Sequence, residues 1–210
     1  MNVLILGATG YLGPHVARAL AARHKVLMTD VQAPPSDPGF PFRKIDVASL
    51  DQMLDVASGM DAIVNCSVVR QGVQVCFDVN MKGCWNMMTA AVKHGIQRVI
   101  NTGPHLAFAG PLYEVFDYEI SPDAPPHPGT QLYGITKSLG QEVCRVFTEH
   151  HDISVLEYLF YNFRDPRGVP PAYYSYLRPG SNPVPFVSSG ADAGEAIRLG
   201  VEIERSKLPS

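Results

Sequence analysis

The sequence contains few of the residues that build disulfide frameworks or metal sites. Its 210 residues include only four cysteines, and none of them stands in a CxxC pair or at a Cys/His metal spacing. Neither a disulfide-rich fold nor a structural zinc site is therefore expected. The thiols predicted to be free and buried are those of Cys66, Cys76, Cys84 and Cys144.

The chain also lacks a charge excess and a long apolar run. The formal net charge is -3, and no cluster of Lys and Arg is interleaved with aromatic residues. A nucleic-acid partner is therefore not expected. The first apolar segment, Val3–Leu6, has no basic residues before it and is too short for a signal sequence or a membrane span. These absences predict a cytoplasmic protein without a membrane partner.

The composition that remains is that of an ordinary globular protein. Hydrophobic residues make up 46% of the chain and charged residues 18%. A chain of this length fits one domain, or one domain with a small appendage, and buries a substantial core.

Strand and helix patterns alternate along the chain. Val3–Leu6 is a continuous apolar run closed by Gly7, and Pro14–Ala22 carries small and apolar residues at helical spacing. Further strands are predicted at Lys25–Thr29, Phe42–Val47, Ala62–Cys66, Arg98–Thr102 and Ile153–Phe160, and further helices at Leu50–Ala57, Asp78–His94, Leu132–His150 and Ala191–Glu204. This alternation predicts an α/β fold with a doubly wound parallel sheet and helices on both faces. The Pro-rich segments 103–131 and 163–190 are predicted to be irregular.

A glycine-rich turn joins the first strand to the first helix. Gly7, Gly10 and Gly13 are spaced three apart, a variant of the dinucleotide-binding fingerprint of a Rossmann-type sheet. Gly7 permits the sharp turn, Gly10 lets backbone approach a pyrophosphate, and Gly13 lets the helix pack on the strand. The turn residues predicted to hold the dinucleotide are Gly7, Thr9, Gly10, Tyr11, Leu12 and Gly13. The alternative is a tight turn without a ligand.

A carboxylate follows the second strand at the expected distance from the glycines. Asp30 lies about twenty residues beyond the turn, where it is placed to accept hydrogen bonds from ribose hydroxyls. No Arg or Lys stands at Val31–Pro35 to bind a 2′-phosphate, so the pattern favours NAD over NADP. The alternative for Asp30 is a solvated loop carboxylate.

A phenol and an ammonium group lie one helical turn apart in a later helix. Tyr133 and Lys137 are four residues apart and share one helix face. A neighbouring Lys cation is predicted to lower the pKa of the tyrosine toward the range that acid–base catalysis needs. The alternative is an exposed tyrosine stacked on a lysine stem.

These motifs, taken in order, resemble the extended branch of the short-chain dehydrogenase/reductase superfamily, the NAD-dependent epimerase/dehydratase proteins. The resemblance covers residues 1 to about 162 and rests on Gly7–Gly13, Asp30, Asp46-Val47, Asn80 to Asn86, and Tyr133–Lys137 with Glu142. It implies an NAD-binding Rossmann domain over residues 1–162, followed at 163–210 by an abbreviated substrate-side segment with a terminal helix.

The resemblance also implies roles for single residues. It assigns Asp46 and Val47 to the adenine, Cys66 and Ser67 to the cofactor-lining segment, Asn80 to support of the active site, Phe160 to the nicotinamide side and Lys137 to the nicotinamide ribose. The alternative for Val47 and Cys66 is that their side chains belong to the hydrophobic core while their backbone still contacts NAD. Members of this branch often dimerise through two long helices, which here are residues 78–94 and 132–150, so a homodimer is expected.

The sequence departs from the family pattern in two places. The usual Thr/Ser-Ser-Ser after the fifth strand is replaced by Thr102-Gly103-Pro104-His105, which leaves Thr102 or His105 as the substitute hydrogen-bond donor. The alternative for Thr102 is a strand-end hydroxyl bonded to backbone. The chain after residue 162 is also short, and its polar candidates for a phosphate or carboxylate and a sugar ring are Arg164, Arg167, Tyr173, Tyr174, Tyr176 and Arg178. An irregular surface loop is the alternative for that segment.

Two functions follow. The first is an NAD-dependent oxidoreductase or epimerase that acts on a hydroxyl or carbonyl of a sugar or nucleotide-sugar-like substrate. In it Tyr133 is the acid/base, Lys137 its assistant and Thr102 the hydroxyl partner. The second is a non-catalytic dinucleotide-binding sensor or interaction protein that has lost the active-site serine. A truncated chain, with the rest of the substrate site elsewhere, is compatible with either.

Overall fold

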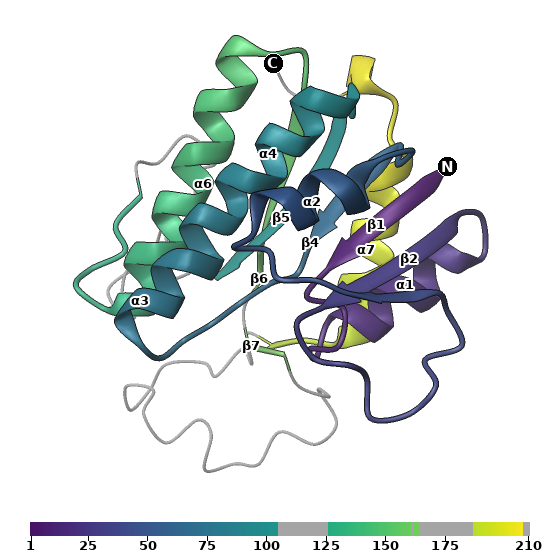
Figure 1. Ribbon diagram of the computed structural model, residues 1–210, viewed down its shortest axis with the longest axis horizontal. Coiled ribbons are helices and arrows are strands. Elements are labelled where there is room, and N and C mark those ends of the chain that lie inside the picture. Colours follow the sequence, from purple (N-terminus) through teal and green to yellow (C-terminus); the bar gives the residue numbers. More distant parts are fainter. Residues whose placement is uncertain (105–125, 161, 164–186, 208–210) are drawn as a thin grey trace, which may run out of the picture.

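A computed structural model describes residues 1–104, 126–160, 162–163 and 187–207 of the chain. Its centre is a six-stranded parallel sheet in the order β3-β2-β1-β4-β5-β6 (Figure 1). The strands are β1 (Asn2–Leu6), β2 (Lys25–Asp30), β3 (Phe42–Lys44), β4 (Ala62–Asn65), β5 (Arg98–Pro104) and β6 (Ser154–Phe160). The predicted doubly wound α/β sheet is confirmed. The strand order reverses between β1 and β4, which is where such sheets bind ligands.

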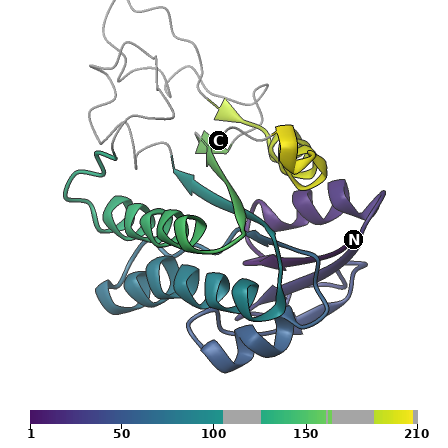
Figure 2. The same cartoon turned by 90° about the horizontal axis from the view of Figure 1, so that it is seen from above.

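Helices cover both faces of the sheet. The helices are α1 (Gly13–Ala21), α2 (Leu50–Ala57), α3 (Val73–Cys76), α4 (Gly83–His94), α6 (Leu132–His150) and α7 (Gly190–Glu202). The helices α2, α4 and α6 lie on one face, and α1 and α7 lie together on the other (Figures 1 and 2). Among the described residues, no helix has the length and apolar character to cross a membrane.

The first strand shows why the sequence folds this way. Leu4 and Leu6 point into the core beneath α2, α4 and α6, whereas Val3 and Ile5 point into the core beneath α1 and α7. All four side chains are at most 1% exposed, because a central parallel strand is covered on both faces. The unbroken apolar run in the sequence is the signature of this position.

Several predicted boundaries differ from the observed ones. The strand predicted over 42–47 ends at Lys44, because it is an edge strand that pairs only with β2 before the chain turns at Asp46. The helix predicted over 78–94 begins earlier, at Val73, and contains a π-helical turn, η1 (Phe77–Lys82), before α4. Such turns widen a helix locally and often lie at functional sites. The fifth strand continues past Thr102 to Pro104, in register with β6.

The end of the described chain packs back onto the sheet. The helix α7 lies against α1, and two of its glycines make this close approach possible. A Cβ atom at Gly194 would lie 2.8 Å from the carbonyl oxygen of His15. Ile197 and Val201 of α7 belong to the core beneath α1. The division at residue 162 stays a prediction, and these side chains from beyond it complete the core.

The remaining described elements are short. The strands β7 (Asn162–Phe163) and β8 (Val187–Ser188) pair in parallel, and a 3-10 turn, η5 (Arg205–Lys207), follows α7. All four cysteines are free and buried. Among the described residues, no three His, Cys, Asp or Glu side chains gather as a metal site would require.

Candidate functional site

A hollow of about 280 Å³ opens at the carboxyl ends of the strands around β1. Seven residues assigned to the cofactor from sequence line it together: Gly7, Gly10, Asp30, Asp46, Val47, Cys66 and Ser67. The sequence reasoning missed the rest of the wall, which consists of Val31, Ile45, Ala48, Val68, Val69, Val75, Asp78 and Val79. Only the folded chain, which brings five separate segments together, reveals these mainly apolar neighbours.

Each of the three glycines of the turn has a different structural role. Gly7 has a φ of +70°, and a Cβ atom there would lie 2.6 Å from the Cα of Ser67. A Cβ atom at Gly13 would lie 2.3 Å from the carbonyl oxygen of Ala8, so any side chain would push α1 off its strand. Among the described residues, a Cβ atom at Gly10 would have one neighbour within 4 Å, the Gly7 carbonyl oxygen at 3.4 Å. Fold packing therefore requires Gly7 and Gly13, and the open side of Gly10 faces the hollow.

The other turn residues take different positions. The Thr9 amide donates to Asp30 Oδ2 at 3.0 Å, which ties the turn to the end of β2. Leu12 is buried in the core at the N-terminus of α1. The Tyr11 ring is exposed and lies against His15 and Phe163, with ring centroids 5.5 and 5.3 Å away. Of the turn residues, only Gly7 and Gly10 line the hollow itself.

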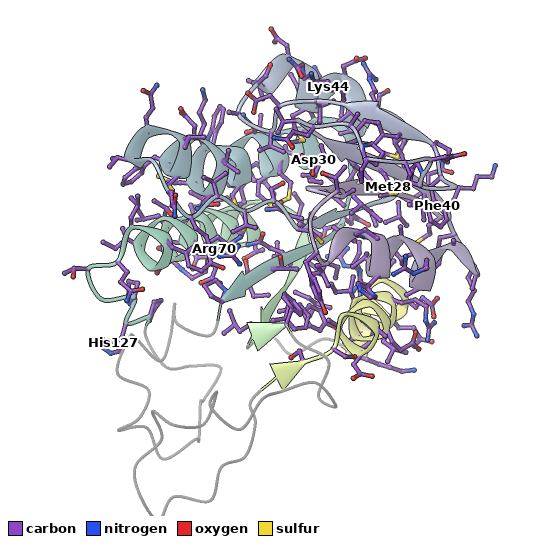
Figure 3. All side chains as sticks on the ribbon, turned by 90° about the horizontal axis from the view of Figure 1, so that it is seen from below. Met28, Asp30, Phe40, Lys44, Arg70 and His127 are labelled. Atoms are coloured by element: carbon purple, nitrogen blue, oxygen red, sulfur yellow. The ribbon has the colours of Figure 1, made fainter. Side chains whose placement is uncertain are left out.

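Two of the three described carboxylates that line the hollow lie at the ends of neighbouring strands, Asp30 as the last residue of β2 and Asp46 just after β3. Asp30 is held by the Thr9 amide, and Asp46 accepts a hydrogen bond of 2.9 Å from the Ala48 amide. No Lys or Arg is among the described residues that line the hollow. Lys44 stands opposite Asp30 in the β2–β3 ladder but outside that lining (Figure 3). The electrostatics of the wall are therefore acidic at this end.

The segment after β4 forms the opposite wall. The Ser67 amide donates to Asn65 Oδ1 at 3.0 Å, a turn that aims the chain across the end of β1. The Ser67 hydroxyl is buried and has no hydrogen-bond partner among the described residues. A buried polar atom without a partner is costly, and a ligand with hydroxyl or phosphate groups would satisfy it. The open side of Gly10 and this hydroxyl both fit a dinucleotide.

The Tyr133–Lys137 pair takes a form that differs from the prediction. Lys137 is 3% exposed, and its Nζ lies 3.5 Å from the Ser67 carbonyl oxygen, beside the cofactor wall. The cation next to the tyrosine is Arg70, whose Cζ lies 5.1 Å from the Tyr133 ring centroid. Burial raises the pKa of Tyr133, and the charge and hydrogen bond of Arg70 lower that pKa in part. The predicted lowering of this pKa by Lys137 is therefore wrong: burial raises the pKa overall, and the cation that offsets this in part is Arg70.

Arg70 was missed because nothing in its sequence surroundings marks it. It lies in the loop that follows β4, about sixty residues before Tyr133, and only the fold brings the two together. Figure 3 shows Arg70 beside α6, away from Asp30. This contact between an arginine and a tyrosine ring depends on the tertiary structure, so the sequence pattern alone does not predict it.

Thr102 and its neighbours explain the absent serine. The Thr102 hydroxyl donates to the Asn65 carbonyl oxygen at 2.8 Å, which supports the alternative of a strand-end hydroxyl bonded to backbone. A Cβ atom at Gly103 would lie 2.1 Å from Nε2 of Gln141, a side chain that is 6% exposed. The Gln141 amide thus occupies the space that a serine at position 103 would need. His105 lies outside the described residues.

Asn80 and Phe160 have structural partners. Asn80 Nδ2 donates to the Val69 carbonyl oxygen at 2.7 Å and to Thr136 Oγ1 at 3.0 Å, and its Oδ1 accepts from the Val69 amide at 3.0 Å. It therefore fastens the loop after β4 to α6, which agrees with a supporting role. Phe160 stacks on Tyr158 with ring centroids 5.8 Å apart. The arginine and tyrosine candidates from Arg164 to Arg178 lie outside the described residues.

Comparison with known proteins identifies the family. Residues 3–171 match the sequence profile described as the NAD dependent epimerase/dehydratase family. The chain belongs to this family. The predicted resemblance to the extended branch of the short-chain dehydrogenase/reductase superfamily is therefore confirmed.

Curated relatives of the chain include sugar-nucleotide and sugar-acid enzymes. It is 25% identical over 183 residues to GDP-mannose 3,5-epimerase 1 of Oryza sativa subsp. japonica, covering 80% of this chain and 48% of that protein. It is 26% identical over 160 residues to uronate dehydrogenase of Pseudomonas putida, covering 74% of this chain and 58% of that protein. The chain spans about half the length of these relatives.

Solved structures show the same fold. MoeE5 in complex with UDP-glucuronic acid and NAD aligns with a TM-score of 0.75 at 21% identity, covering 97% of this chain and 73% of that one. UDP-N-acetylglucosamine 4-epimerase from Bacillus cereus aligns with a TM-score of 0.75 at 14% identity, covering 100% of this chain and 76% of that one. At these identities the likeness establishes the fold alone.

Proposed function

We propose that the chain binds NAD in the hollow at the β1–β4 switch point and that it is the dinucleotide-binding part of an enzyme. The reaction we propose is oxidation or epimerisation at a hydroxyl or carbonyl of a sugar or nucleotide-sugar-like substrate. The observation that carries the proposal is the meeting of Gly7, Gly10, Asp30, Asp46 and Ser67 around one hollow. The relatives named above act on such substrates or bind NAD by their names, which supports this assignment.

Each part of the hollow suits one part of the cofactor. The backbone of Gly7 and Gly10 and the N-terminus of α1 suit the pyrophosphate, and Asp30 suits the hydroxyls of the adenosine ribose. The segment 46–47 suits the adenine. The Ser67 hydroxyl and Lys137 suit the nicotinamide half. Bound NAD would supply the hydride acceptor or donor for the reaction.

The acidic lining supports NAD as the cofactor in place of NADP. The carboxylates of Asp30 and Asp46 would repel a 2′-phosphate, and no lining residue among those described is a cation. Lys44 is exposed and in register with Asp30 but does not line the hollow, so its substitution is the control in the binding test below.

In the proposed mechanism, Tyr133 exchanges the proton of the substrate hydroxyl. Burial raises the pKa of Tyr133, and the guanidinium of Arg70, which lies over the ring, partly offsets this and favours the phenolate. Lys137 is itself held against the Ser67 carbonyl, so it joins the tyrosine side of the site to the cofactor wall. The roles of Tyr133 and Lys137 in catalysis are part of the proposal.

A dinucleotide-binding protein without turnover is the second candidate. It is favoured by the commitment of the Thr102 hydroxyl to backbone and by the occupation of the space beside Gly103 by Gln141. These contacts leave the usual serine position without a free hydroxyl among the described residues of β5.

Calorimetric titration with NAD and NADP tests the cofactor assignment. We expect NAD to bind more tightly than NADP, and we expect Asp30→Ala to weaken NAD binding about tenfold or more because ribose hydrogen bonds to a carboxylate are lost. Lys44→Met, an exposed change on the neighbouring strand, is the control and should leave NAD affinity unchanged. Equal affinity for the two cofactors would contradict the proposed selectivity.

Turnover separates the two candidate functions. Tyr133→Phe should abolish oxidation of an accepted sugar or nucleotide sugar while NAD affinity stays within about twofold, since the phenol acts on the substrate. Unchanged turnover in this variant would exclude Tyr133 as the acid/base. No NAD reduction across a broad panel of sugars, uronates and nucleotide sugars would favour the non-catalytic function.

A homodimer is also proposed. Exposed apolar side chains lie seven residues apart on each of two adjacent helices, Trp85 and Val92 on α4 and Leu139 and Val146 on α6. Seven residues are about two helical turns, so each pair shares one face. Light scattering after size exclusion is the measurement, and a monomer at micromolar concentration would contradict the proposal.

A further inference from the structure

A row of three polar side chains runs from the central strand β4 through β5 to the edge strand β6. Asn65 of β4, Asn101 of β5 and Glu157 of β6 stand at the same register, each directly opposite the next. Asn65 is 3% exposed and Asn101 is fully buried. Polar residues in central parallel strands are unusual, because these strands are covered on both faces. The row faces α4, where the Cys84 thiol lies 3.7 Å from Asn65 Nδ2.

The three side chains form one hydrogen-bonded chain that ends at the cofactor wall. Asn101 Nδ2 donates to both carboxylate oxygens of Glu157, at 2.9 and 3.0 Å. Asn65 Nδ2 donates to Asn101 Oδ1 at 2.8 Å, and the Ser67 amide donates to Asn65 Oδ1 at 3.0 Å. The chain therefore runs from β6 to the segment that lines the hollow.

The carboxylate at one end determines the direction of every bond in the row. An ionised carboxylate only accepts hydrogen bonds, whereas an amide side chain presents a donor on one side and an acceptor on the other. Asn101 must turn its NH₂ toward Glu157, which leaves its oxygen for Asn65. Asn65 must then turn its own oxygen toward the Ser67 amide. A reversed Asn65 would face that amide with its NH₂ group, donor against donor.

The end of the row coincides with the cofactor wall and with Lys137. The carbonyl of Ser67 lies 3.5 Å from Lys137 Nζ, and its hydroxyl is the buried group without a partner. Burial raises the pKa of the Glu157 carboxyl, and the Asn101 donor and the positive charge of Lys137 lower it. The positive charge of Lys137, which lies beside the cofactor wall, thus favours the ionised form of Glu157 at the far end of the row.

We propose that Glu157 is a positioning residue which, through Asn101 and Asn65, fixes the orientation of Ser67 in the dinucleotide site. It touches neither cofactor nor substrate and acts only through the two amides. The proposal rests on the proposed function, because it assigns the Ser67 segment to NAD. It goes beyond that function in naming a residue outside the hollow that sets the affinity of the site.

The test compares two substitutions at position 157 by calorimetry and by amide hydrogen exchange at pH 8. Glu157→Leu removes the acceptor, so Asn101 and Asn65 lose their enforced direction. We expect the Ser67 amide to exchange about tenfold faster or more, and NAD affinity to fall about five- to tenfold. Glu157→Gln keeps an acceptor oxygen of the same shape and should retain most of both properties. Glu195→Leu, the same change at an exposed site on α7, should alter neither.

A second variant guards against a loss of folding in Glu157→Leu. Replacing both Asn101 and Glu157 with Leu also removes the Asn101 NH₂ group, which Glu157→Leu alone would leave buried without its acceptor. This double variant should fold and should show the same fast exchange at Ser67 as Glu157→Leu. Slow Ser67 exchange in either folded variant would overturn the proposal.

The failure of this inference is distinguishable from the failure of the proposed function. The exchange of the Ser67 amide is measured without any ligand, so it tests the row even if the wild-type chain binds no NAD. If wild type binds NAD and the Leu variants bind it equally well, the row does not position the site. If wild type binds no NAD, the proposed function is wrong and the exchange data still decide whether Glu157 orders Ser67.

Discussion

At the scale of single residues, the site depends on which groups find partners inside the protein and which do not. Thr102, Asn80 and the Thr9 amide are all satisfied by protein atoms. The Ser67 hydroxyl is not satisfied within the described part of the chain. Residue type and spacing predicted where polar groups would gather. The direction of each hydrogen bond follows from the fold.

The contact between Arg70 and Tyr133 leads to a prediction at this scale. Arg70→Met removes the positive charge over the ring and keeps a side chain of similar length. Because the charge and hydrogen bond of Arg70 lower the pKa of Tyr133, the variant should raise that pKa and move the alkaline-side rise in turnover to higher pH.

Carbon-13 labelling of the tyrosine rings allows the titration to be followed by NMR, with Tyr133→Phe used to assign the signal. Arg18→Met, a change on α1 at the other face of the sheet, should leave the titration of Tyr133 as in wild type. A Tyr133 titration that is unchanged in Arg70→Met would show that the guanidinium does not act on the phenol.

At the scale of elements, periodicity and the glycine turn predicted most of the fold. The unbroken apolar runs predicted the buried strands, and apolar residues at helical spacing predicted α2 and α6 with their observed bounds. The sequence pattern did not reveal the π-helical turn before α4. The Asn80 side chain in this turn bonds to Val69 and Thr136, which come from distant segments, and the sequence pattern does not show such contacts. For the same reason the row of Asn65, Asn101 and Glu157 appears only when strand register is known.

The packing of α6 on the π-helical turn carries a prediction of its own. A Cβ atom at Gly140 would lie 2.2 Å from the Asn80 carbonyl oxygen and 2.9 Å from the Cys84 sulfur. Gly140→Ala should lower the free energy of unfolding by about 2 kcal/mol, because overpacking outweighs the better helix propensity of alanine. Urea denaturation measures this change, and Ser138→Ala on the same helix should stay within about 0.5 kcal/mol of wild type.

NAD affinity should fall in Gly140→Ala as well, since α6 carries Lys137 toward the Ser67 carbonyl. A variant as stable as wild type would mean that α6 moves away from the turn at little cost, and that Gly140 does not set the position of the helix.

At the scale of the whole molecule, a single partly buried carboxylate should leave a signature in the pH dependence of stability. Burial raises the pKa of Glu157 in the folded state above its value in the unfolded chain. The folded state therefore holds this proton more tightly. The resulting stability is fully present below the unfolded pKa and is lost as the pH rises through the folded pKa.

Glu157→Gln removes the titration and keeps the shape. The free energy of unfolding of this variant, minus that of wild type, should therefore increase as the pH rises from 4 through the folded pKa, and then level off. Glu195, whose pKa the neighbouring Arg198 lowers, gives the opposite sign, so Glu195→Gln should lose stability relative to wild type as the pH rises. Urea denaturation across this range measures both differences. If the difference in free energy of unfolding between Glu157→Gln and wild type does not change with pH, folding does not change the proton affinity of Glu157. Ionisation of this carboxyl would then not destabilise the folded state.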